Sequence, residues 1–223
     1  MSNQSVQVAT QLASKGLRPT SEWLSSFLSS QKNNPPLQSL LQTAQFRLYA
    51  SDITTTFARD ACFPGDLVNP QIKEQKLSGI IPVQVLGVED ISKSRWEQVE
   101  AIEAIERGES KKGREIIRVA AIGDAQDQGG SGHVQTGGIH KLLLQDAAGN
   151  RAFGLELRSV EGVGLGMNIG CKLLLREAVV ARGVILLESK TVTVLGGKID
   201  AFHKAWREGR KAELIRGIEE QGC

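Results

Sequence analysis

The sequence predicts a mainly β protein with flanking helices, an α+β fold in which a small helical bundle precedes a barrel of five or six short strands. Three observations lead to this prediction. Apolar residues recur at helical spacing up to about residue 75, change to short runs of valine, isoleucine and leucine between residues 77 and 195, and return to helical spacing after Gly196-Gly197. We therefore expect two domains, which comprise residues 1–75 and 76–223.

Three short helices account for the first domain. The segment Val6–Lys15 ends at Gly16, because glycine adopts the left-handed conformation that closes a helix at little cost. Pro19-Thr20-Ser21 supplies the start signal of a second helix. In the third, one apolar stripe comprises Leu37, Leu40, Leu41, Ala44 and Leu48. Facing stripes of this kind predict a three-helix bundle, which a turn at 62–66 terminates.

Short strands separated by turns fill most of the second domain. Phe153, Leu155 and Leu157 alternate with polar or small residues, which is the two-residue period of a half-buried strand. The predicted strands are Leu77–Val88, Ile139–Gln145, Phe153–Leu157, Cys171–Glu177, Gly183–Leu187 and Thr191–Leu195. Five or six short strands in one block favour a small OB-type barrel, and a C-terminal helix at 198–220 follows it.

A long insertion, residues 90–138, separates the first and second predicted strands. We expect it to form no strand, and loops of this length in compact domains are usually functional or disordered. Its first half, Arg95–Arg107, is predicted to be an amphipathic helix, and a basic cluster and a glycine-rich stretch follow. A tethered amphipathic helix is typical of a device that inserts into a partner. The predicted contact residues of the insertion are Trp96, Val99, Ile102, Ile105, Lys111, Lys112 and Arg114.

Composition limits the classes of function. Lysine and arginine number 27 against 25 aspartate and glutamate, so the net charge is only +2 and lacks the basic surplus of proteins that depend on phosphate contacts. The three cysteines are odd in number and widely spaced, which argues against a disulfide framework and favours a reducing compartment. No apolar run reaches membrane-spanning length and no signal peptide opens the chain, so we expect a soluble intracellular protein.

No motif predicts an enzyme. The glycine-rich run 162–170 lacks the spacing of a nucleotide-binding loop and precedes a strand instead of a helix. His133, His140 and His203 have no cysteine pair or carboxylate at metal-ligand spacing. We therefore expect no catalytic residues, no cofactor, no metal and no small-molecule substrate.

Aromatic residues are almost missing from the predicted barrel. OB barrels that hold single-stranded nucleic acid stack bases on aromatic rings in a basic groove. Between Leu77 and Leu195 the aromatic residues are Trp96, in the insertion, and Phe153. This shortage favours a barrel that binds protein, with a sequence-independent single-stranded DNA-binding module as the alternative.

Two cations interrupt the apolar strand Cys171–Glu177. Alternation along the strand places Lys172 and Arg176 on the same, solvated face. They are either solvated surface charges or part of a barrel face that pairs with acidic groups of a partner.

Several segments, in this order along most of the chain, resemble the N-terminal region of the RecQ-mediated genome instability protein 1 family. The segment Val192–Ala201, with its Val-Leu-Gly-Gly sequence before a helix, is the most distinctive. The others are Pro19–Leu24, Phe63–Leu67, the strand Leu77–Ser92, Lys141–Asp146, Gly170–Leu175 and Gly183–Leu187. The residues look most like the short fungal members, which lack the second OB domain of longer members.

The resemblance implies a three-helix bundle joined to an OB barrel with an extended insertion between its first two strands. In the family, that insertion docks into topoisomerase III, a type IA enzyme, near its DNA gate and biases gate opening and closing. The helicase–topoisomerase assembly then dissolves double Holliday junctions without crossover. For this chain the resemblance implies a nuclear, non-catalytic scaffold. Its partners would be topoisomerase III and a RecQ-family helicase, and it would contact DNA only indirectly or weakly.

Overall fold

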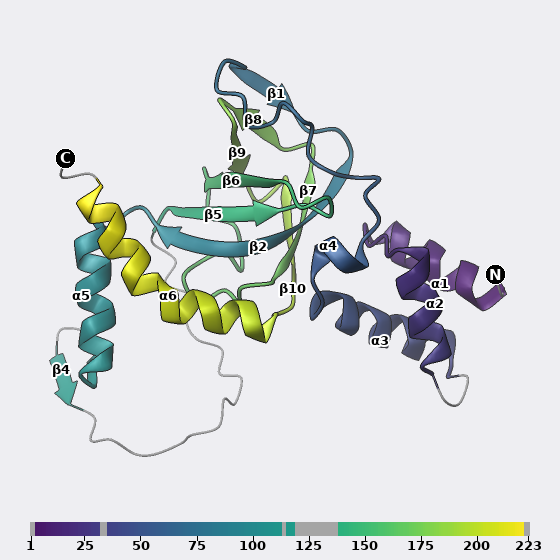
Figure 1. Ribbon diagram of the computed structural model, residues 1–223, viewed down its shortest axis with the longest axis horizontal. Coiled ribbons are helices and arrows are strands. Elements are labelled where there is room, and N and C mark those ends of the chain that lie inside the picture. Colours follow the sequence, from purple (N-terminus) through teal and green to yellow (C-terminus); the bar gives the residue numbers. More distant parts are fainter. Residues whose placement is uncertain (1–2, 32–34, 113–114, 119–137, 221–223) are drawn as a thin grey trace.

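A computed structural model describes residues 3–31, 35–112, 115–118 and 138–220. It contains two hydrophobic cores, one inside a group of N-terminal helices and the other inside a β-barrel (Figure 1). A long C-terminal helix passes along one end of the barrel (Figure 1). The expected fold class, an OB barrel with N-terminal helices and a C-terminal helix, is confirmed.

The N-terminal helices form where their caps and apolar stripes predict. They are α1 (Asn3–Ser14), α2 (Ser21–Ser29), α3 (Leu37–Tyr49) and a short α4 (Ile53–Thr56). The hydroxyl of Thr20 accepts a hydrogen bond from the Trp23 amide at 3.2 Å, which caps the first turn of α2. Leu40, Leu41, Ala44 and Leu48 of the predicted stripe are all buried in the helical core. The four-residue helix α4 was not predicted.

The barrel is one sheet with more strands than expected. Its strands are β1 (Glu74–Lys76), β2 (Ile80–Asp90), β5 (His140–Gln145), β6 (Arg151–Glu156), β7 (Lys172–Arg176), β8 (Val179–Ala181), β9 (Val184–Leu187) and β10 (Val192–Gly196). They lie in the order β1-β8-β9-β6-β5-β2-β7-β10, which makes eight described strands instead of five or six. The two extra strands, β1 and β8, have three residues each, too few to show a period of two.

A sharp bend between β7 and β8 brings the two ends of the sheet together. Glu177 lies there with φ 50°, and its amide donates a hydrogen bond to the Gly79 carbonyl at 3.3 Å. Before the bend β7 pairs with β2 and β10, and after it β8 pairs with β1 and β9. One nearly continuous segment therefore closes the barrel, and β6 and β9 complete it as a parallel pair.

The insertion between β2 and β5 contains more regular structure than predicted. Helix α5 (Arg95–Glu106) lies where the sequence predicts a helix. The expectation that residues 90–138 form no strand is wrong, because β3 (Glu109–Lys112) and β4 (Glu115–Arg118) form an antiparallel pair. The β-branched Ile116 and Ile117 favour the second of these strands. The predicted glycine-rich stretch falls largely at 119–137, outside the described residues.

Buried polar contacts join the helical domain to the barrel along a seam. The Gln84 side chain in β2 is buried, and its Oε1 accepts a hydrogen bond from the Ile53 amide at 3.0 Å, at the start of α4. The carboxylate of Asp146 accepts a second hydrogen bond, from the Phe63 amide at 2.8 Å. Gly16 packs against Leu174, an outward-facing residue of β7. The helices therefore cover the outer side of β2 and β7.

The Gly-Gly sequence that ends β10 lies at the same seam. Gly197 has φ 98°, and a Cβ added there would lie 2.4 Å from the Tyr49 carbonyl oxygen at the end of α3. A side chain would therefore meet both an unfavourable backbone conformation and a backbone oxygen. This close approach explains why the most distinctive sequence segment contains glycine at this position.

Replacing Gly197 with alanine is expected to destabilise the protein by about 3 kcal/mol or more, because a positive φ and a backbone clash act together. Chemical denaturation of Gly197→Ala and wild type measures the difference in the free energy of unfolding. Gly209→Ala is the control. Gly209 lies inside α6 (Asp200–Glu219), where an added Cβ meets nothing within 4 Å, so alanine should stabilise the helix slightly. Equal stability of Gly197→Ala and wild type would contradict the close packing at the seam.

Candidate partner-binding surfaces

Helix α5 begins at a complete capping box. The Ser94 hydroxyl accepts a hydrogen bond from the Glu97 amide at 3.1 Å, and the Glu97 carboxylate accepts one from the Ser94 amide at 2.8 Å. These reciprocal bonds satisfy two amides that would otherwise lack partners at the start of the helix. The local sequence therefore fixes where α5 begins.

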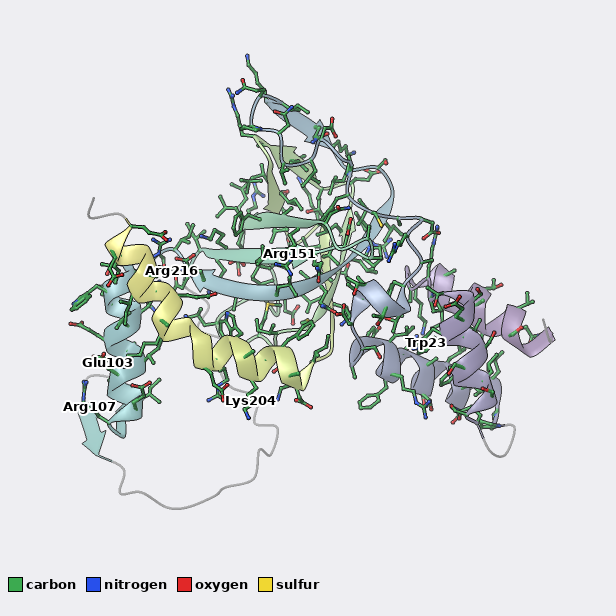
Figure 2. The ribbon with its side chains drawn as sticks, in the orientation of Figure 1. Trp23, Glu103, Arg107, Arg151, Lys204 and Arg216 are labelled. Atoms are coloured by element: carbon green, nitrogen blue, oxygen red, sulfur yellow. The ribbon has the colours of Figure 1, made fainter. Side chains whose placement is uncertain are left out.

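Helix α6 packs against α5 at the end of the barrel (Figure 2 labels Glu103 on α5 and Arg216 on α6). The Arg95 guanidinium donates a hydrogen bond to the Gly217 carbonyl at 2.7 Å and forms an ion pair with Glu89 of β2 at 3.2 Å. An alanine at Gly217 would place its Cβ 2.8 Å from the Arg95 guanidinium, so glycine leaves room for this contact. Lys211 of α6 adds an ion pair at 3.2 Å to Glu103.

A second anchor joins α5 to both neighbours. The buried Gln98 side chain donates a hydrogen bond from Nε2 to the Asp90 carbonyl at 2.8 Å and accepts one at Oε1 from Arg210 at 3.2 Å. Val99 on α5 and Leu214 on α6 are also buried. Because polar and apolar contacts both fix α5, the first half of the insertion has a defined position on the barrel.

The predicted apolar series on α5 does not form one buried stripe. Val99 is 3% exposed and Ile102 is half-buried, but Trp96 is 59% and Ile105 is 73% exposed. Each residue turns about 100° around an α-helix, so steps of three residues fall about 60° short of a full turn. Over the three steps from Trp96 to Ile105 this lag reaches about 180°. The two exposed residues therefore flank opposite sides of the buried face.

Two residues of the basic cluster after α5, Lys111 and Lys112, lie in β3, which pairs with β4. Lys111 pairs in register with Ile116, and Lys112 pairs with Glu115. Arg114 lies outside the described residues. The contribution of these three cations to binding stays a prediction.

Buried polar groups hold the two ends of the insertion together. Asp90 ends β2 and pairs in register with His140, the first residue of β5. The His140 ring contacts the buried Glu156 carboxylate, with 2.6 Å between Nδ1 and Oε2, and Glu156 also accepts a hydrogen bond from the Val160 amide at 2.8 Å. Sequence reasoning treated His140 as an unremarkable strand residue and missed this contact, because its partner lies on the neighbouring strand.

The structure contradicts the prediction that Lys172 is solvated. Its side chain is fully buried, and Nζ donates hydrogen bonds to the Gly170 carbonyl at 2.6 Å and the Tyr49 carbonyl at 3.3 Å. Alternation along β7 does place Lys172 on the outer side of the barrel, but the helical domain covers that side here. Burial lowers the pKa of Lys172 to about 8. Lys172 is thus part of the seam and is not available to a partner.

Arg176, the second predicted cation of this strand, is exposed. Its side chain lines an open hollow of about 600 Å³ together with Val179 and Leu186, and it makes no hydrogen bond or ion pair with a described residue. Lys76 and Lys190 at the same hollow are paired with Glu177 and Glu188, each at 2.7 Å.

The hollow borders a surface that we call the outer apolar face. Its residues are exposed or half-buried side chains on the outer side of β6, β8 and β9, together with Leu157 directly after β6. They are Phe153, Leu155, Leu157, Val179, Val184 and Leu186. An outer barrel face that contacts only water is normally polar. Sequence alternation predicted that β6 has an outer side, but it did not predict that this side joins apolar residues of two further strands.

Aromatic residues of α6 also contact the barrel. The sequence-based prediction did not include them, because it considered aromatic residues only between residues 77 and 195. Phe202 and Trp206 pack partly buried against the barrel core. The Arg210 guanidinium lies 4.9 Å from the Trp206 ring centroid, and Lys141 Nζ lies 5.3 Å from that of Phe153. Cations of the protein itself therefore already lie over the rings of Trp206 and Phe153.

Among the described residues, no group of three or more histidine, cysteine, aspartate or glutamate side chains could hold a metal ion. No described helix is both long and apolar enough to cross a membrane. Cys62 and Cys171 are free thiols, and burial raises the pKa of both.

Two family models match the chain in the order of its domains. The model of the RMI1 N-terminal helical domain matches residues 12–56, and that of the RMI1 N-terminal OB-fold domain matches residues 63–210. The second match alone covers more than half of the chain. The chain belongs to the RMI1 family. Among curated proteins it is similar to RecQ-mediated genome instability protein 1 of Schizosaccharomyces pombe, with 28% identity over 232 aligned positions that cover 96% of this chain and 97% of the relative.

The RMI1 family matches agree with the division of the structure into a helical domain and a barrel domain. The first contains the C-terminal end of α1 and all of α2, α3 and α4, and the second runs from the turn before β1 into α6. The insertion with α5 lies inside the OB-fold match. The exposed residues of α5 and the outer apolar face therefore belong to the same family domain.

The buried ammonium group of Lys172 predicts a specific pH dependence of stability. The unfolded chain keeps this proton up to about pH 10.5 and the folded chain releases it near pH 8, so the unfolded state binds more protons between these values. Wild-type stability should therefore rise relative to Lys172→Met as the pH rises, by on the order of 2 kcal/mol between about pH 7 and pH 10. Urea denaturation across this range measures the difference. The same comparison for the exposed Lys190→Met should stay flat, and a flat Lys172 difference would contradict the assigned burial.

Proposed function

We propose that this chain is a non-catalytic scaffold subunit of a nuclear complex of topoisomerase III and a RecQ-family helicase. Membership of the RMI1 family supports a role in genome stability, and the name of the S. pombe relative ties that protein to RecQ-mediated genome instability. In this role the chain binds the topoisomerase, biases its DNA gate through the insertion between β2 and β5, and so promotes dissolution of double Holliday junctions without crossover. It contacts DNA only indirectly or weakly.

The observation that carries the proposal is the combination of a fixed position and an exposed surface on α5. Arg95 and Gln98 anchor the helix to α6 and β2, yet Trp96 and Ile105 remain 59% and 73% exposed. Large apolar side chains on a fixed helix bind a partner at a low cost in conformational entropy. The buried Val99 supports the position of α5, and Ile102 is half-buried. In this proposal Lys111, Lys112 and Arg114 bind DNA or an acidic region of the topoisomerase.

Replacing Trp96 or Ile105 with alanine should weaken binding to topoisomerase III by more than about tenfold, because buried tryptophan and aliphatic anchors dominate interfaces. Both side chains are exposed, so the variants should keep wild-type stability. Calorimetric titration with the purified topoisomerase measures the affinity. Phe46→Ala is the matched control, because Phe46 is 75% exposed on α3 of the helical domain. Unchanged binding by both α5 variants would overturn the proposed contact.

The alternative function is a sequence-independent single-stranded DNA-binding module. Such a module needs rings that are free to stack and a basic groove. The cations over Trp206 and Phe153 and the near-neutral net charge of +2 disfavour it. The full chain should therefore bind an oligothymidine more weakly than micromolar at physiological salt, and a salt titration by fluorescence anisotropy tests this. Submicromolar binding with a steep loss of affinity at higher salt would favour the alternative.

A further inference from the structure

A second surface, remote in sequence from α5, also has the chemistry of a binding site. The outer apolar face contains three pairs of apolar residues that lie opposite each other on adjacent strands. Leu155 of β6 pairs with Leu186 of β9, and Leu186 pairs with Val179 of β8. In the adjacent cross-strand row, Phe153 pairs with Val184. Two adjacent cross-strand rows are therefore apolar.

Charged residues border these rows. Lys141 of β5 pairs with Leu155 at one end of the first row, and Lys76 of β1 pairs with Val179 at the other. Strands lie about 4.8 Å apart, so this row spans about 19 Å, the length of roughly six residues of extended chain. A peptide of that length can cross the face between the two lysines.

The two arginines near the face lack the ion pairs that the two lysines form. Lys141 and Lys76 already form ion pairs with Glu89 at 2.6 Å and Glu177 at 2.7 Å. Arg151 precedes Phe153 on the outer side of β6, and Arg176 lines the hollow beside Val179 and Leu186. The guanidinium group of neither arginine is hydrogen-bonded or ion-paired within the described part of the chain. Two guanidinium groups therefore remain available for carboxylates of a partner, with which arginine forms paired hydrogen bonds.

We propose that the outer apolar face binds an extended, acidic segment of a partner protein, in which apolar side chains alternate with aspartate or glutamate. The apolar side chains of the segment would cover Leu155, Leu186 and Val179, and its carboxylates would pair with Arg151 and Arg176. A nucleic acid fits less well, because five of the six side chains of the face are aliphatic and cannot stack on bases as aromatic rings do. The surface is separate from α5, so one chain could hold two partners at once.

Selection from a random peptide library displayed on phage tests the proposal on the full folded chain. Enriched peptides should combine at least two apolar residues with at least two carboxylates. Synthetic versions of them should bind wild type with micromolar affinity, and binding should weaken with rising salt. Arg176→Glu should reduce the affinity by about tenfold or more through charge repulsion, and Leu157→Asp should do so by placing a charge on the apolar face.

Control variants elsewhere on the surface test whether peptide binding is specific to the outer apolar face. Lys204→Glu reverses an exposed cation on α6, and Phe46→Asp places a charge at an exposed apolar residue of α3 (Figure 2 labels Arg151 and Lys204). Neither should change peptide binding. Trp96→Ala should also leave it unchanged, so failure of this proposal and failure of the α5 contact can be told apart.

Five results would overturn the proposal. The selection could yield no binding peptides or only basic ones, or the selected peptides could bind Arg176→Glu as well as wild type. An oligothymidine whose binding depends on Arg176 would assign the face to nucleic acid. A dimer in solution that dissociates on the Leu157→Asp substitution would assign it to a second copy of this chain.

Discussion

The buried ammonium group of Lys172 is the interaction on which the arrangement of the two domains depends. An ammonium group without access to water is tolerated only when hydrogen bonds replace its hydration. Here the carbonyls of Gly170 and Tyr49 replace it, and Tyr49 lies at the C-terminal end of α3, where the helix dipole favours a positive charge. Because the Gly170 carbonyl belongs to the barrel and the Tyr49 carbonyl to the helical domain, the ammonium group links the two domains across the seam. Gly197 allows the same carbonyl to approach the end of β10, so one short region fixes α3, β7 and β10 together.

That seam decides which outer faces of the barrel remain available. The helical domain covers the outer side of β2 and β7, and α6 with α5 covers one end of the barrel. The outer side of β6, β8 and β9 stays uncovered among the described elements and has apolar side chains. The proposed scaffold function therefore rests on surfaces that are distributed around the barrel. The exposed residues of α5 and the outer apolar face lie on different elements, which suits a scaffold that holds more than one partner.

Much of the fold was predictable from local pattern. The stripe Leu40–Leu48, the cap at Thr20 and the box at Ser94 are interactions within a few residues, and each helix appears where these signals place it. The longer strands follow from their apolar runs. The strands β1 and β8 were not predictable, because three residues show no period and their pairing partners lie far away in sequence. The series Trp96 to Ile105 was misleading, because an i+3 repeat drifts around a helix whose turn needs 3.6 residues.

The sequence by itself determined the fold class, the position of the insertion, the start of α5 and the resemblance to a family, because these depend on local periodicity, caps and residue order. Only the tertiary structure decided which outward-facing residues meet water. Alternation placed Lys172 and Arg176 on the same side of one strand, yet the helical domain buries the first and leaves the second exposed. The same holds for Trp206, which the chain brings to the barrel from beyond the last strand. A two-residue period states which side of a sheet a side chain occupies, but what covers that side depends on contacts between residues distant in sequence.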